Sequence, residues 1–200
     1  MPNFDTPTLT NLQLLALPNG PGNGVAVPTG ARFWYATALG YKEAADRLIA
    51  TIIDKRWGRD PSGAPAMFLY RHYVELHLKS LLIEAGELLD EPQAVPPKHY
   101  LWVLWTRVRA LLLKVGGSSD GPWLRRADEI ITSLDDLDPT SFAFRYPVDN
   151  AGARTLPEGF RFDAATVRQV IDELHILLDG ASTQIDVYKD CKRDAGSFSV

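Results

Sequence analysis

One strongly apolar stretch, residues 67–89 with the sequence MFLYRHYVELHLKSLLIEAGELL, constrains the fold more than any other part of the chain. At 100° of rotation per residue, its leucine, isoleucine, valine and tyrosine side chains occupy nearly the whole circumference of a helix. A helix that is apolar almost all round is stable only when other helices surround it. The stretch therefore predicts the central helix of a helical bundle.

The polar side chains of this helix form two groups. Arg71, His72, Glu75 and Lys79 lie within about 100° of arc, and neighbouring members four residues apart have opposite charges that pair on one helix face. His77 lies about 120° from Arg71 on an ideal helix. Two interpretations stay open for each group. The group of Arg71, His72, Glu75 and Lys79 is either a partly buried ion-pair ladder or a ligand-binding face. His77 is either a hydrogen-bonded core residue or a reactive one.

The rest of the chain predicts four more helices. They are expected from Thr29 to about residue 57, from His99 to Gly116, from Asp120 to Asp138, and from Asp163 into the C-terminal region, where Gly180 either ends or bends the helix. Residues 58–65, GRDPSGAP, predict a connector before the central helix. Between the last two helices the alternating segments SFAFRYP and GFRFD predict a short hairpin or an extended loop. The fold class is all-α, a bundle of about five helices.

The length of 200 residues with 46% hydrophobic content suits one domain with a single core. Residues 1–28 are rich in proline and glycine and predict an N-terminal arm. Residues 29–192 form the bundle, and residues 193–200 predict a mobile tail.

Composition excludes several classes of protein. No apolar run approaches the length of a membrane span, and the first residues lack the basic and apolar regions of a signal peptide. The lone Cys191, expected to be buried or half-buried, fits a reducing compartment and excludes a cysteine-rich zinc site. A net charge of −4 argues against nonspecific coating of nucleic acid. We expect a cytoplasmic protein without a membrane anchor.

The spacing from Arg71 to His77, an arginine, a polar residue, four residues and a histidine, resembles the signature of the HEPN superfamily. Two later segments resemble, in the same order, segments of HEPN-like bacterial proteins: KHYLWVLW from Lys98 and LDPTSFAFRYPVD from Leu137. The resemblance covers about residues 30–180. It implies a bundle of four or five helices, usually dimeric, in a group that includes many metal-independent endoribonucleases.

The resemblance implies RNA as the substrate, a homodimer, a role of toxin or defence type, and an antitoxin or nucleotidyltransferase as a further partner. His77 would act as acid or base on a ribose 2′-hydroxyl, and Arg71 would stabilise charge on the phosphate, with His72 and Glu75 in support. These roles suit histidine, which titrates near neutrality, and arginine, which matches phosphate in geometry. No cofactor or metal is expected. Substrate contacts are expected from Lys79, His99, Arg145 and Tyr146.

Other interpretations remain open. A non-catalytic HEPN-like module that binds a nucleotide or a protein predicts that Arg71 is paired with Glu75 and shielded from solvent. A bundle without any ligand is the third interpretation. The alternative expectations are that His99 begins its helix, that His175 lies at the surface, and that the aromatic residues near Arg145 are core contacts. A metal site using His72 with Glu75, or His72 with His77 and His99, is disfavoured, because matching ligands on other helices are missing.

Overall fold

A computed structural model describes residues 33–54, 59–97, 99–116 and 121–197, and within these ranges it contains five α-helices and no strand. The predicted all-α bundle is confirmed. In chain order the helices are α1 (Phe33–Ile53), α2 (Arg59–Leu88), α3 (Leu101–Gly116), α4 (Pro122–Leu137) and α5 (Ala164–Ser197).

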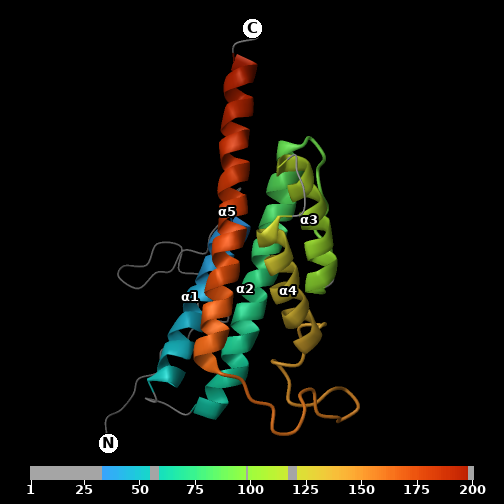
Figure 1. Ribbon diagram of the computed structural model, residues 1–200. Helices are drawn as coiled ribbons and strands as arrows, with labels where there is room; N and C mark the ends of the chain where they lie inside the picture. The colour runs from blue at the N-terminus through green and yellow to red at the C-terminus, as the bar shows by residue number, and fades with distance from the viewer. Residues whose placement is uncertain (1–32, 55–58, 98, 117–120, 198–200) are drawn as a thin grey trace, which may run out of the picture.

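Helix α2 is the central element, as the sequence predicts. It lies between α1 and α5 on one side and α3 and α4 on the other (Figure 1). Residues 73–82 are buried without interruption, over almost three turns. Each leucine in this segment contributes about 1.5–3 kcal/mol by leaving water. The side chains around the whole circumference of this helix segment are therefore buried, as the sequence predicts.

The start of α2 differs from the prediction. The helix begins at Arg59, so residues 59–65 of the predicted connector are helical, while Gly58 lies outside the described residues. Pro61 lies in the first turn, where backbone N–H groups have no helical partner, and Pro65 forfeits a single hydrogen bond. Two prolines so close to an N-terminus therefore do not prevent the helix from forming.

The other helix boundaries largely follow the sequence. Helix α3 ends at Gly116, and the carboxylate of Asp163 accepts a 2.7 Å hydrogen bond from the backbone N–H of Thr166, which confirms it as the cap of α5. Helix α4 begins at Pro122 after Gly121, while the predicted cap Asp120 and the predicted start at Thr29 lie outside the described residues.

Helix α5 is longer than predicted. It continues through Gly180 to Ser197, so the segment predicted as a mobile tail is helical as far as the structure describes it. Cys191 lies on this helix and is exposed, which corrects the expectation that it is buried. The helix extends well past the ends of its neighbours (Figure 1), and a side chain there has few residues to pack against.

Residues 138–163 form the predicted extended loop and not a hairpin. Turns dominate this segment, and one isolated antiparallel bridge joins Val148 to Arg154. Phe144 is buried and anchors the loop to the bundle.

Two further expectations concern the N-terminal arm and the lack of a membrane span. The predicted arm, residues 1–28, lies outside the described residues. Among the helices that the structure describes, none has both the length and the apolar character needed to cross a membrane.

Gly86 sits where the connection after α2 folds back onto the helix. A Cβ at this position would lie 2.7 Å from the backbone oxygen of Glu91 and 2.7 Å from Cγ of Gln93. We expect Gly86→Ala to lower the free energy of unfolding by about 1–3 kcal/mol, because the backbone must move to accommodate the methyl group. Urea denaturation measures this change.

Gly40 on α1 supplies the matched control, because no atom of the part of the chain that the structure describes lies within 4 Å of a Cβ built there. Gly40→Ala is expected to raise the free energy of unfolding by up to about 1 kcal/mol through helix propensity alone. Equal effects at the two positions would contradict the close approach at Gly86.

Candidate functional site

One face of α2 brings together most of the polar residues that the sequence singled out. Phe68, His72, Glu75 and Lys79 follow at spacings of four, three and four residues, so their side chains leave the helix on the same side. We call this set the α2 face. Other elements reach it: α1, the connection between α2 and α3, and the loop after α4.

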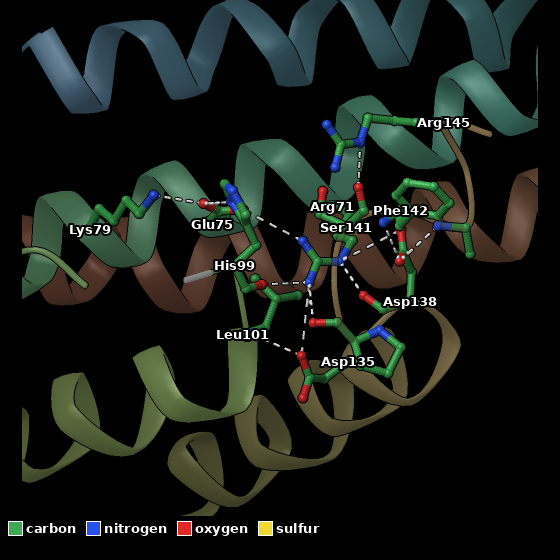
Figure 2. A network of polar contacts seen from close by, with 12 residues as sticks. Arg71, Glu75, Lys79, His99, Leu101, Asp135, Asp138, Ser141, Phe142 and Arg145 are labelled. Carbon is green, nitrogen blue, oxygen red and sulfur yellow. Dashed lines mark hydrogen bonds and ion pairs between the residues drawn. The ribbon is translucent and has the colours of Figure 1, made fainter. Parts of the chain in front are cut away.

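Arg71 lies at the edge of this face and is buried, with 1% of its surface exposed. Its Nε donates to the backbone oxygen of Asp138 at 2.7 Å, and one Nη donates to the backbone oxygens of His99 at 2.6 Å and Pro139 at 3.2 Å. The other Nη lies 3.5 Å from a Glu75 oxygen (Figure 2). The guanidinium thus joins α2 to two segments that are distant in sequence.

Three carboxylates of the described part of the chain lie near the buried guanidinium of Arg71. Burial lowers the pKa of Arg71, and Asp138, Glu75 and Asp135 oppose that shift. The Asp135 carboxylate lies 3.9 Å from Arg71 and also accepts the backbone N–H of Leu101 at 2.8 Å, so it caps α3. Arg71 therefore remains charged inside a polar cage.

Asp138 is held at the end of α4. One of its carboxylate oxygens accepts backbone N–H groups of Phe142 at 2.7 Å and Ala143 at 3.0 Å, which fixes the start of the loop. Its other oxygen is buried, has no hydrogen-bond partner among the described residues, and lies 4.0 Å from Nε of Arg71. The attraction between these two charges partly offsets the cost of burying that oxygen.

Glu75 is the acceptor at the centre of the α2 face. One of its oxygens lies 2.6 Å from Nζ of Lys79 and 2.8 Å from Nδ1 of His99. Burial alone would raise the pKa of Glu75, but the hydrogen bonds and charges of Lys79 and His99 outweigh burial and lower it. The carboxylate is therefore ionised and binds three cationic or polar partners.

His99 is the point at which this network reaches solvent. Arg71 holds its backbone oxygen and Glu75 holds its ring, while 48% of its side chain is exposed. The ionised carboxylate places the ring proton on Nδ1, so Nε2 carries a free lone pair when the ring is neutral. In Figure 2 His99 lies over Glu75, between Lys79 and Arg71.

Aromatic rings surround the remaining polar groups of the face. His72 stacks on Phe68 at 5.6 Å and meets the edge of Tyr41 at 4.4 Å, and burial lowers its pKa. The exposed Arg145 lies over two rings, 5.7 Å from the centre of Phe68 and 5.6 Å from that of Tyr146. The face thus combines positive charge with aromatic surface.

His77 belongs to a different cluster. It leaves α2 on the opposite side, towards α5, where its Nδ1 lies 3.1 Å from the hydroxyl of Tyr73 and its Nε2 lies 3.3 Å from Oγ of Ser182. The same Tyr73 hydroxyl lies 3.0 Å from Nδ1 of His175. We call these four residues the His77 cluster.

The shared hydroxyl couples the two histidines. A tyrosine hydroxyl has one proton, so one Nδ1 accepts that proton and the other Nδ1 must carry its own and donate. Burial lowers the pKa of His77 to about 4, and burial also lowers the pKa of His175. Both rings are therefore neutral at neutral pH, with opposite tautomers at Nδ1.

The predicted site residues are thus divided between two places. Arg71, Glu75, Lys79 and His99 form one network, and His72 and Arg145, with Tyr146, lie around the same α2 face. His77 is on the far side of the helix. His175, expected at the surface, is half-buried in the His77 cluster. The site also contains residues that the sequence did not predict, Ser182, Asp135 and Asp138, because their only sequence signals were their positions at a helix edge or a helix end.

Among the residues that the structure describes, no three histidine, cysteine or acidic side chains are arranged to hold a metal ion. Comparison with models of protein families, with curated proteins and with solved structures finds no match to this chain.

Proposed function

We propose that this chain is an HEPN-like helical module that binds RNA or a nucleotide along the α2 face and does not cleave it. The observation that carries the proposal is the burial of both signature residues in separate clusters. Acid–base cleavage of RNA needs the histidine and the arginine within reach of one phosphodiester. Arg71 instead donates its hydrogen bonds to backbone oxygens and to Glu75.

The groups available to a ligand are those around the α2 face. Arg145 and Tyr146 are exposed, and an arginine beside aromatic rings suits a phosphate with a base stacked next to it. His99 offers a ring nitrogen to solvent, while Lys79 contributes charge from a buried position. The network around Arg71 then has a positioning role. It holds the backbone of the loop after α4 and the ring of His99, which present these groups.

A homodimer belongs to this proposal, as does an antitoxin or nucleotidyltransferase partner, because the resemblance to HEPN-like proteins implies both. Light scattering of the purified chain tests the dimer.

RNA binding can be measured by fluorescence anisotropy with a labelled single-stranded RNA. We expect Arg145→Ala and Tyr146→Ala each to weaken binding about tenfold or more, because each removes a phosphate contact or a stacking surface. Both side chains are exposed, so the fold should survive. Arg47→Ala is the matched control, since Arg47 is an exposed arginine on α1. Equal losses in all three variants would reduce the proposal to nonspecific charge attraction.

The second candidate is a metal-independent endoribonuclease. The observation that favours it is His99, whose outward ring is oriented by a buried carboxylate in the manner of a general base. Incubation of RNA with the protein in EDTA separates the candidates. Intact RNA supports the binding module. Cleavage that disappears in His99→Ala or His77→Ala, with the fold retained, would replace it with the nuclease.

A further inference from the structure

The outward face of α5 carries apolar side chains directly opposite the core. Ile171, Leu174, Leu178 and Ile185 are buried against the bundle. About half a turn of the helix away lies a row at spacings of four, three and four residues. Its members are Ile176, Gly180, Thr183 and Val187, all of them exposed. We call this row the outer stripe.

The exposure of this row is unusual for a surface helix. Such helices place polar side chains opposite the core, yet Ile176 is 70% exposed and Val187 is 52% exposed. Ile176 is the most exposed of the large hydrophobic residues among those that the structure describes. The spacing is also that of a seam along which a second helix packs.

Gly180 adds an independent observation. A glycine inside a helix is about 1 kcal/mol less favourable than alanine, so it needs a reason. No described residue lies within 4 Å of a Cβ built at Gly180, so packing among the described residues does not require a glycine there. A missing side chain on an exposed helix allows the backbone of a partner to approach closely.

Charge decides what kind of partner fits. The charged residues of α5 within about 60° of the outer stripe on an ideal helix are six acidic residues and one arginine, and they are Asp172, Glu173, Asp179, Asp186, Asp190, Asp194 and Arg168. Asp172 pairs with Lys42 and Arg168, Glu173 with Arg126 and Asp190 with Arg193, but the side chains of Asp172, Glu173 and Asp190 remain 45%, 43% and 64% exposed.

The lysines of α5 point the other way. Lys189 binds Glu87 at 2.7 Å, and Lys192 donates to the backbone oxygen of Leu88 at 3.0 Å, so both are committed to the end of α2. A second copy of this face would therefore bring carboxylates against carboxylates, whereas a basic partner would gain from them.

We propose that the outer stripe docks a basic amphipathic helix of a partner protein, with small or apolar residues of that helix crossing at Gly180. The surface is separate from the α2 face, which lies on the side of α2 away from α5. Docking here therefore does not depend on the RNA-binding proposal.

The test uses the full chain and a designed peptide of several heptads, with an alanine and leucine seam flanked by lysines. A peptide with glutamates in place of the lysines is the charge control. Saturable binding of the lysine peptide is expected by calorimetry, with no binding of the glutamate peptide. Ile176→Asp combined with Val187→Asp, and separately Gly180→Leu, should each weaken binding at least about tenfold.

Val103→Asp on α3 is the matched control, because Val103 is 51% exposed on a different helix. It should leave binding unchanged, and circular dichroism should show intact helices in every variant. Absence of saturable binding, equal binding of both peptides, or insensitivity to Gly180→Leu would overturn the proposal. Dimers that dissociate in Ile176→Asp with Val187→Asp would also overturn it, since they would assign the stripe to a second copy.

Discussion

Glu75→Ala is expected to lower the free energy of unfolding by about 3–5 kcal/mol, the largest loss for any single charged residue considered in this chain. The reason is that Lys79 would remain buried without its carboxylate, and Arg71 would keep only Asp138 and Asp135 of the three carboxylates that the structure describes near it. His99 would also lose the partner that orients its ring. Urea denaturation followed by circular dichroism measures the loss.

Glu173→Ala provides the control for this prediction. Glu173 also pairs with an arginine, at 2.8 Å, but both side chains are more than two-fifths exposed. Surface pairs of this kind contribute about 0–1 kcal/mol. If Glu75→Ala cost no more than Glu173→Ala, the Arg71 network would not be a stabilising element.

The double replacement of Arg71 by methionine and Glu75 by leucine adds a sharper comparison. A buried ion pair that is replaced by apolar residues of similar volume often costs less than removal of one partner. In this protein, the double replacement would also take Glu75 from Lys79 and Arg71 from the buried oxygen of Asp138. We therefore expect the double variant to be no more stable than Glu75→Ala, which would show that the two residues act within a network and not as an isolated pair.

Acidification is expected to destabilise the protein through His77 before most carboxylates titrate. The pKa of His77 is about 4 in the folded protein and about 6.5 in an unfolded chain, so the folded state binds fewer protons between these values. The contribution of the neutral His77 ring to the free energy of unfolding is fully present above pH 6.5 and is lost as the pH falls towards 4. The loss amounts to about 2 kcal/mol at pH 5 and about 3 kcal/mol at pH 4.

The free energy of unfolding at several pH values between 7.5 and 4.5 tests this prediction. His77→Phe should flatten the profile, whatever its stability at pH 7, because the titrating ring is gone. Ser182→Ala removes a hydrogen bond but keeps the ring, so its profile should keep the slope. A slope that is identical in wild type and His77→Phe would assign the acid sensitivity to other groups.

Protonation of the two histidines is anticooperative. His175 shares the Tyr73 hydroxyl with His77, and the centres of the two rings lie 6.3 Å apart. Protonation of either ring adds charge beside the other, and Asp179 is the carboxylate that favours protonation of both. Charging of the second ring is therefore opposed once the first is charged.

Local sequence determined the parts of this protein that depend on nearest neighbours along the chain. The apolar circumference of residues 67–89 required a surrounding bundle, and Asp163 capped the last helix as its position suggested. The opposite charges of Arg71 and Glu75 indicated a pair on one face, which the structure confirms. Each of these features follows from helix geometry, which residues within a turn or two fix.

Tertiary structure alone decided which side of α2 each polar group meets. Rotation along the helix separates His77 from Arg71. It does not reveal that His77 lies against Ser182 and His175 of α5, or that Arg71 donates to the backbone oxygens of His99 and Asp138. These partners come from 28 to 105 residues away in sequence. Packing of distant segments selects them, and no local periodicity encodes that choice.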